Sequence, residues 1–288
     1  MNYILLVASA LASSLKGLIC KKIGTDNSDP RRIHFINGVL FFVAAMEALV
    51  FAALSGTLRL PSPQTLILAA VFSASLLFTQ LVQTYSMKLG PASITTLIYA
   101  TGLVLPILYG SVFLAEAISP MQIIGTAAVA LALFLIIDPK KDRSFSAKWL
   151  IFSFLAAAGS GTSAIIQKVH QSSAVQDELG LFLITGLLLC ALYSFILARP
   201  AHPANRPAMT AASVRFMLFS GLSIGALNIL NLYLAGKLPA IIQVPIYNIG
   251  SMILTSLGGR LFFGEKMSGK KLAGFAFGCA AILMIGLG

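Results

Sequence analysis

The stretch from Gly264 to Lys271, GEKMSGKK, is the nearest approach in this sequence to a nucleotide-binding motif. It follows the phosphate-binding pattern GxxxxGK[ST] except at the last position, where Lys271 replaces the Ser or Thr that would hold Mg²⁺. The pattern also needs a strand before the loop, whereas a long apolar run precedes this one. The stretch is therefore not predicted to bind a nucleotide.

Two ionisable residues lie deep within apolar runs. Glu47, in FFVAAMEALVFAAL, is predicted to face a cavity or a partner and to bind a cation or a proton, or else to be protonated and hydrogen-bonded to a neighbouring helix. Lys16, in ASSLKGLICKK, either extends to the membrane surface along its flexible stem or contacts a substrate. Their different depths argue against a direct pair, but together they could bracket a zwitterion.

Uncharged polar residues gather in the later apolar runs. Asn228 and Asn231 share a helix face, and Gln243, Tyr247 and Asn248 form a second set. Such groups replace the water shell of a substrate, or they form ordinary interhelical hydrogen bonds. Tyr99 and Tyr247 occupy matching places in two similar segments and could cradle an amine by cation–π attraction, or simply pack in the core. Weaker candidates of the same kind are Gln80, Gln83 and Gln167.

Prolines and glycines mark positions where helices bend or approach closely. Pro106 and Pro245 each remove a helix hydrogen bond, which suits either a gating hinge or a static bend. Gly274 and Gly278 form a GxxxG motif in the last apolar run. This motif predicts either a homodimer through that helix or close packing inside one monomer.

The elements that must position these residues are membrane helices. Of 288 residues, 58% are hydrophobic and only 10% are charged, whereas soluble domains carry about 25% charged residues. A bilayer core of about 30 Å needs about 20 helical residues, and helices satisfy their own backbone hydrogen bonds in lipid. Ten such runs are predicted: 3–21, 33–55, 64–87, 91–114, 120–137, 149–168, 179–198, 213–235, 239–263 and 270–287.

An internal repeat explains the lysine-rich motif. LAEAISPMQIIG (114–125) aligns with FGEKMSGKKLAG (263–274), and GPASITTLIYATG (90–102) aligns with LPAIIQVPIYNIG (238–250). The sequence therefore predicts an all-α integral membrane protein with two five-helix repeats, residues 1–140 and 141–288. An odd number of helices in each repeat inverts their topology, an arrangement of alternating-access carriers.

The distribution of Lys and Arg predicts the orientation. Most of them fall in the connections on one side of the ten spans, while Arg59, Lys168 and Lys237 fall on the other. Because positive charge collects in cytoplasmic loops, the rich side is predicted to be cytoplasmic and both termini to lie outside, in a multi-pass plasma (inner) membrane protein.

With these motifs in place, the sequence resembles the drug/metabolite transporter superfamily, in its ten-helix EamA-type branch. The resemblance rests on the repeated turns Ala115-Glu116 to Gly125 and Gly264-Glu265 to Gly274, and on the Pro-Ala openings at Pro91 and Pro239. It implies an inverted-repeat carrier whose central cavity is lined by the first four helices of each half, with the fifth helices at the periphery. Its substrates would range across amino acids, amines, sugars and nucleotide derivatives.

The function predicted from these features is secondary transport of a small polar organic metabolite, amino acid or amine-like, by alternating access. The alternatives are an organic-cation or multidrug carrier and a non-transporting receptor or assembly protein. No catalytic, metal or cofactor set lies at one depth, so an enzyme is not expected. Expected partners are the substrate, membrane lipid and a coupled proton, without nucleic acid.

Overall fold

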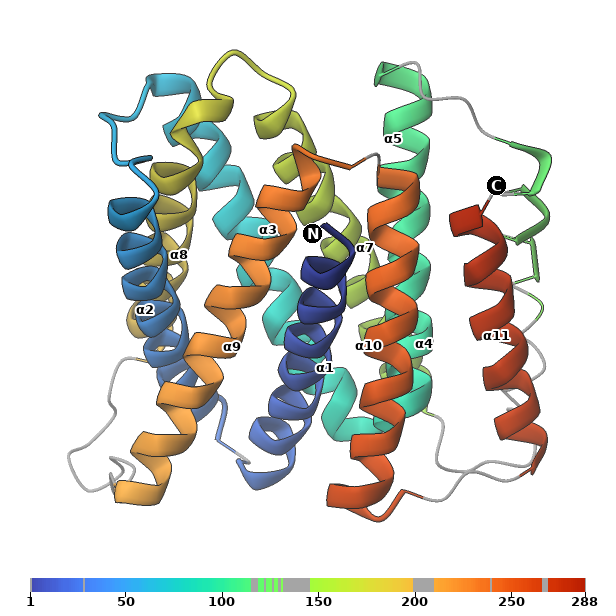
Figure 1. Ribbon diagram of the computed structural model, residues 1–288. Coiled ribbons are helices and arrows are strands. Elements are labelled where there is room, and N and C mark those ends of the chain that lie inside the picture. Colours follow the sequence, from blue (N-terminus) through green and yellow to red (C-terminus); the bar gives the residue numbers. More distant parts are fainter. Residues whose placement is uncertain are drawn as a thin grey trace.

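The computed structural model describes residues 2–27, 29–114, 119–121, 123–125, 127–128, 131, 146–198, 210–238, 240–265 and 269–287. The elements in this part of the chain are all helical (Figure 1). They are α1 (Asn2–Asp26), α2 (Pro30–Leu54), α3 (Pro63–Leu89), α4 (Ala92–Ala100), η1 (Thr101–Leu103), α5 (Val104–Leu114), α7 (Ala147–Gln171), η2 (Gln176–Glu178), α8 (Leu179–Leu197), α9 (Ala211–Ala235), α10 (Ala240–Phe263) and α11 (Gly269–Leu287).

The predicted spans agree closely with these helices, and seven helices among the described residues are long and apolar enough to cross a membrane. The predicted span 120–137 and the basic connections 139–148 and 199–213 lie mostly outside the described residues, as do Glu116 and Pro239. The all-α architecture is thus confirmed, while the inverted repeat and its two halves remain a prediction.

Polar residues fix where the helices begin. The Asp29 side chain accepts a hydrogen bond from Arg31 N at 2.9 Å, directly before Pro30 opens α2. Ser62 caps α3 in the same way, with its hydroxyl accepting from Thr65 N at 3.2 Å. These caps satisfy amide groups that have no partner within the helix, and proline suits the first helical position because it has no amide hydrogen to lose there.

The fourth predicted span is one helix in the sequence and two in the structure. A 3₁₀ turn at Thr101–Leu103 separates α4 from α5. Pro106 explains the break, because it cannot donate to the carbonyl of Gly102 four residues earlier. The other predicted hinge, Pro245, lies within α10, which continues from Ala240 to Phe263 without such a break. The two prolines therefore have different effects on the backbone.

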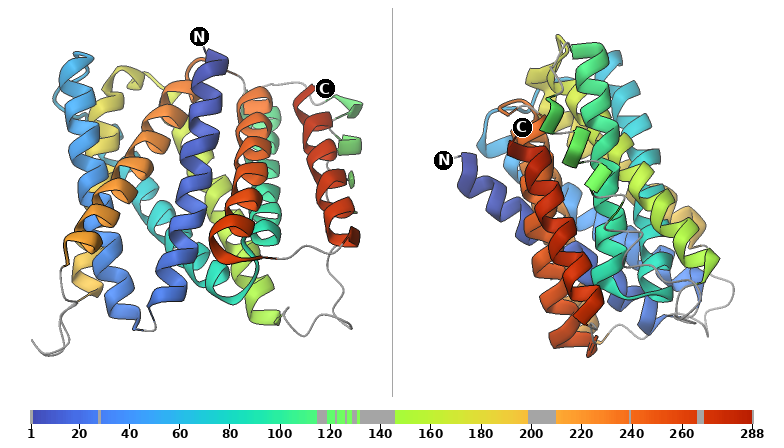
Figure 2. Two further views of the ribbon diagram at one scale, coloured as in Figure 1. Left: turned by 60° about the horizontal axis from the view of Figure 1, so that its bottom comes forward. Right: turned by 90° about the vertical axis from the view of Figure 1, so that its right-hand side faces the viewer.

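The helices stand side by side in one bundle, with α2 and α8 at one edge and α11 at the other (Figures 1 and 2). The two termini lie at the same end, and α1 and α7 run in opposite directions. Two apolar clusters fill the interior. One joins α2, α3, α8 and α9, and the other joins α4, α10 and the beginning of α1. The middle of α1 therefore passes between two packed regions.

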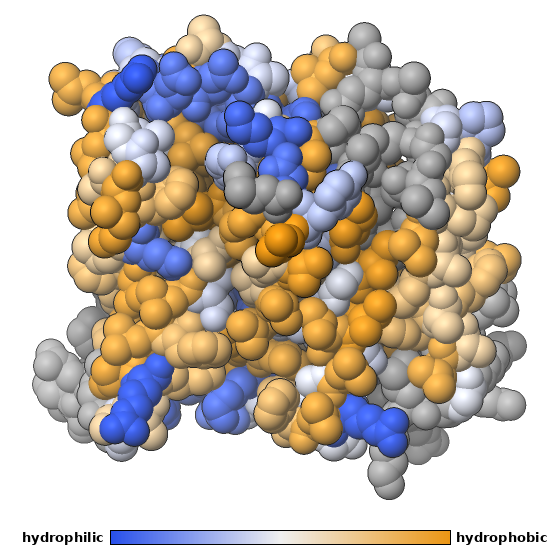
Figure 3. Space-filling view, in the orientation of Figure 1, coloured by the Kyte–Doolittle hydropathy of each residue, from blue (hydrophilic) through white to orange (hydrophobic). Residues whose placement is uncertain are grey.

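The surface has the pattern of a membrane protein. Figure 3 shows a broad apolar belt with hydrophilic residues gathered at its two ends, and one hydrophilic spot inside the belt over α2 and α9. We call the end where α1 finishes and α2, α7 and α9 begin the basic end. Described residues near it include Lys22, Arg31, Arg32, Lys148 and Arg215, whereas Arg59 and Lys237 lie at the opposite end.

Candidate functional site

A small polar cavity lies in the middle of the bundle, between the two apolar clusters. Its volume is about 40 Å³, enough for a few water molecules and far below the 300–1,000 Å³ or so of pockets that hold organic ligands. Six helices contribute to it, α1, α3, α4, α7, α9 and α10. The lining residues are Ser13, Lys16, Leu76, Thr79, Tyr99, Ser160, Ser163, Ala164, Gln167, Leu227, Asn228, Asn231 and Tyr247.

A second space of about 20 Å³ adjoins the first and shares Ala164, Gln167, Asn231 and Tyr247 with it. Other residues around it include Pro106, Lys168 and Gln243. The predicted hinge Pro106 thus touches the polar interior. The two spaces together form the candidate site, which we call the central cavity.

Lys16 points into the bundle rather than toward the membrane surface. Only 5% of the residue is exposed, and its ammonium lies 5.9 Å from the centre of the Tyr99 ring. The ion pairs found in the described part of the chain are Lys21–Glu265, Lys22–Asp26 and Arg59–Asp177. Neither Lys16 nor Glu47 belongs to any of these pairs.

Tyr99 and Tyr247 come together across the cavity from α4 and α10. Both side chains lie near the Ser160 hydroxyl of α7. Tyr247 is 8% exposed. The predicted pair of matching tyrosines therefore exists in space, with the two phenol groups converging on one hydroxyl.

The amides of α9 divide their hydrogen bonds between the helix and the cavity. Asn228 donates to Ile224 O at 2.8 Å within α9. Asn231 accepts from the Ser9 hydroxyl at 2.6 Å through its side-chain oxygen, and its backbone carbonyl accepts from the Gln243 side chain at 2.9 Å. The side-chain NH₂ of Asn231 takes part in neither of these hydrogen bonds, and Asn231 lies on the cavity wall.

Three predicted candidates are placed in helix packing instead. Gln80 donates to Asn37 Oδ1 at 3.3 Å between α3 and α2, and Gln83 accepts from the Cys20 thiol at 3.9 Å between α3 and α1. Asn248 is buried in α10 next to the cavity residue Tyr247. None of the three lines the central cavity.

Glu47 also lies outside the central cavity. It is half-buried at the seam between α2 and α9, where a Cβ added to Gly225 would collide with its carboxylate. One carboxylate oxygen, Oε2, is buried without a hydrogen-bond partner. Among the described residues, neither α2 nor α8 contributes to the cavity wall. The resemblance implied that both would line it, so this part of its implied cavity is corrected.

Several lining residues escaped the sequence analysis, above all Ser13, Thr79, Ser160 and Ser163. Small hydroxyl residues are common in packed membrane helices, so composition does not single them out. The repeat does carry a signal, because Ser13 and Ser160 are spaced as Lys21 and Lys168 are. Extending the repeat comparison into the first helix of each half would have found them.

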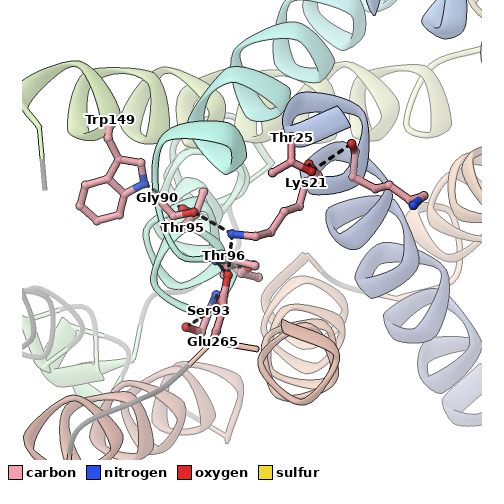
Figure 4. A network of polar contacts seen from close by, with 10 residues as sticks. Lys21, Thr25, Gly90, Ser93, Thr95, Thr96, Trp149 and Glu265 are labelled. Atoms are coloured by element: carbon pink, nitrogen blue, oxygen red, sulfur yellow. Dashed lines mark hydrogen bonds and ion pairs between the residues drawn. The ribbon is translucent and has the colours of Figure 1, made fainter. Parts of the chain in front are cut away.

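A polar network ties α1, α4 and α10 together at the basic end (Figure 4). Lys21 Nζ lies 2.6 Å from Glu265 Oε1 and donates to Gly90 O at 3.0 Å. The same carboxylate accepts from the Ala92 amide at 2.7 Å, at the beginning of α4. The N-cap residue of α4, Pro91, forms no capping hydrogen bond with its side chain. Glu265, which is distant in the sequence, caps the helix instead. The motif that resembled a phosphate loop thus supplies a structural carboxylate.

Comparison with known proteins gives one family and one fold. Residues 1–138 match the model of the EamA-like transporter family. No curated protein matches the sequence. A solved chain titled only "Crystal structure of protein" is 13% identical and has a TM-score of 0.66, with 96% of each chain covered. At this identity the structural match supports the fold and says nothing of the activity.

Proposed function

We propose that this chain, which carries an EamA-like transporter family domain over residues 1–138, moves a small polar organic metabolite across the membrane by alternating access. The match of residues 1–138 to this family supports a membrane transporter rather than an enzyme. The proposed substrate class is amino acid or amine-like, and the proposed mode is secondary transport, with the two predicted halves rocking about the central cavity.

The observation that carries this proposal is the composition of the cavity wall. Three helices from each predicted half contribute, α1, α3 and α4 from the first and α7, α9 and α10 from the second. Matching residues of the repeat meet there, since Tyr99 faces Tyr247, and Ser13 and Ser160 both line the wall. A polar midplane site shared by two related halves is the arrangement that inverted-repeat carriers use.

The contacts between the predicted halves also support rocking. Helix α1 packs on α9 and α10, much as α7 packs on α3 and α4. Hydroxyl pairs line both contacts, including Ser251 to Ser13 at 2.9 Å and Ser75 to Ser163 at 2.9 Å. Small residues let helices approach closely, and each such hydrogen bond contributes only about 1 kcal/mol or less. Contacts of this strength can be exchanged between two states.

A second repeated contact concerns the lysines. Lys21 donates to Gly90 O at 3.0 Å, and its repeat partner Lys168 donates to Leu238 O at 3.4 Å. The two acceptors also occupy matching places in the aligned segments 90–102 and 238–250. This agreement favours the two-repeat interpretation, in which each end of the bundle carries an equivalent lysine-to-loop contact.

The organic-cation alternative depended on Glu47 and the tyrosines. The tyrosines line the cavity but Glu47 does not, and Lys16 gives the cavity a positive group. A cationic solute is therefore less favoured. Glu47 remains a candidate for the coupled proton. Ionisable residues within transmembrane segments are costly and therefore rare, and those that occur often belong to a path for ions or protons.

The direct test is counterflow in proteoliposomes. Purified protein is reconstituted and loaded with one unlabelled solute at a time from a panel of amino acids, amines, sugars and small carboxylates, and uptake of the same labelled solute is measured. Transport predicts saturable, transient accumulation of at least one solute class. A non-transporting receptor would bind a solute but give no accumulation above empty liposomes.

A further inference from the structure

The ammonium of Lys16 is the charged group in the central cavity that lacks a strong partner. It makes one described contact, the 5.9 Å approach to the Tyr99 ring, which is near the limit of cation–π attraction. Lys168, the second lysine at the cavity, is already held by the carbonyls of Ala235 and Leu238 at 3.4 Å each. A buried ammonium without an anion is costly, so an incoming anionic group would offset that cost.

The protein does not supply this anion from its described carboxylates. Five of the six are engaged elsewhere: Asp26 with Lys22, Asp29 with Arg31 N, Asp177 with Arg59, Glu178 with Ser62, and Glu265 with Lys21. The sixth, Glu47, faces Gly225 at the α2–α9 seam. None of the six lines the cavity.

The groups around Lys16 are suited to a carboxylate. The Ser9 hydroxyl donates to the side-chain oxygen of Asn231. The side-chain NH₂ of Asn231 can therefore donate to a carboxylate. The hydroxyls of Tyr99, Tyr247 and Ser160 are also donors on the same wall. A carboxylate has two oxygens and accepts several hydrogen bonds at once, and such charge-assisted bonds are stronger than neutral ones.

From this geometry we infer that the central cavity selects a solute bearing one carboxylate, which binds the Lys16 ammonium with Asn231 and the two tyrosine hydroxyls completing its hydrogen bonds. The single positive charge of the Lys16 ammonium matches a monoanionic group, whereas a phosphate group would carry nearly two charges at neutral pH. This inference rests on the proposed function, because it concerns the same cavity. It narrows the substrate class to carboxylate-bearing solutes, amino acids included, and excludes simple amines.

Binding is measured apart from transport, by thermal stabilisation of the purified full-length protein at constant ionic strength. The ligands are acetate, propionate, glycine and alanine, each compared with its neutral amide or its amine, and with sodium phosphate. Stabilisation by at least one carboxylate, with roughly tenfold weaker apparent affinity for its amide, is the expected result, because the neutral amide cannot form a charge-assisted hydrogen bond with Lys16.

Three variants locate the effect. Lys16→Gln removes the cation and is expected to weaken carboxylate binding at least tenfold, whereas Lys16→Arg keeps it. Asn231→Asp is nearly isosteric and keeps the oxygen that accepts from Ser9, but it gives Lys16 an internal counter-ion and is expected to exclude carboxylates. Asp26→Asn, at the exposed ion pair outside the cavity, is the matched control and should bind like the parent.

The inference is overturned if no carboxylate stabilises the parent protein, if an amine or phosphate does so better, or if Lys16→Gln binds carboxylates as the parent does. Carboxylate binding lost in Lys16→Gln, in a protein that shows no counterflow, would support the inference and contradict the proposed transport. The two failures are therefore distinguishable.

Discussion

Six polar residues that were predicted from the sequence meet in one cavity, namely Lys16, Tyr99, Gln167, Asn228, Asn231 and Tyr247. Their types are unusual within apolar runs, which is why the sequence revealed them. Glu47 has the same signal but lies at another interface. The run FFVAAMEALVFAAL is apolar on every side of the helix. The depth of Glu47 in the membrane can therefore be counted along the run, but the sequence does not show which side of the helix faces the interior.

At the residue scale, the two tyrosine hydroxyls are predicted to contribute to solute binding. Tyr99→Phe and Tyr247→Phe each keep the ring and remove one donor from the cavity wall. Each is expected to raise KM for a transported carboxylate about tenfold, with little change in protein stability. The control is Tyr193→Phe on α8, where the side chain is 45% exposed. Unchanged KM in both cavity variants would assign these rings to packing alone.

The seam between Glu47 and Gly225 gives a second residue-scale prediction. A methyl group at position 225 would collide with the Glu47 carboxylate, and overpacking typically costs about 1–3 kcal/mol. Gly225→Ala is therefore expected to lower Tm by several degrees, and by less in a Glu47→Ala background, where the carboxylate is gone. Because Ala44 Cα also lies close, at 3.1 Å, the rescue should be partial. Strictly additive Tm changes would contradict this contact.

At the scale of helices, the sequence predicted where spans begin and end because hydropathy, caps and prolines are local signals. The caps of Asp29 and Ser62 illustrate this. The capping of α4 was not predictable, since its acceptor, Glu265, is distant in sequence and reaches Ala92 only through the packing of α10 against α4. The 3₁₀ turn at Thr101–Leu103 was not predictable either, because Pro106 removes a helix hydrogen bond without specifying which turn replaces it.

The network of Lys21 and Glu265 is predicted to stabilise the packing of α1, α4 and α10 at the basic end. Both side chains are 11% exposed, and loss of a partner in such a pair leaves a poorly hydrated charge. Glu265→Gln is expected to lower stability by about 2 kcal/mol. The matched control is Asp26→Asn in the Lys22–Asp26 pair, whose side chains are 52% and 56% exposed. Exposed pairs contribute about 0–1 kcal/mol, so equal effects on Tm would argue against a structural role for Glu265.

At the scale of the whole molecule, the internal repeat predicted which segments correspond, and the resemblance predicted a central cavity. The resemblance implied that the first four helices of each half would line it, whereas no described residue of α2 or α8 does so. This difference depends on how the two predicted halves dock. The structure leaves α2 and α8 at one edge, where their apolar residues pack with α3 and α9. Docking is decided by side chains distant in sequence, such as Ser75 with Ser163.

The membrane orientation is predicted from the basic end. Arg59→Cys and Lys148→Cys place one thiol at each end of the bundle, both at exposed positions. An impermeant thiol reagent added to intact cells should label Arg59→Cys and spare Lys148→Cys until the membrane is opened. The parent protein, whose Cys20 and Cys190 are buried, sets the background. The reverse labelling pattern would invert the topology.

The central claim is that one cavity opens to each side of the membrane in turn, and Ser160 lines that cavity. The most direct measurement is the labelling of Ser160→Cys by an impermeant thiol reagent, in right-side-out and in inside-out vesicles, with and without a bound solute. Alternating access predicts labelling from both sides, slowed on both by the solute. Labelling from a single side only, whatever the solute, would contradict the account and favour a receptor with a fixed binding site.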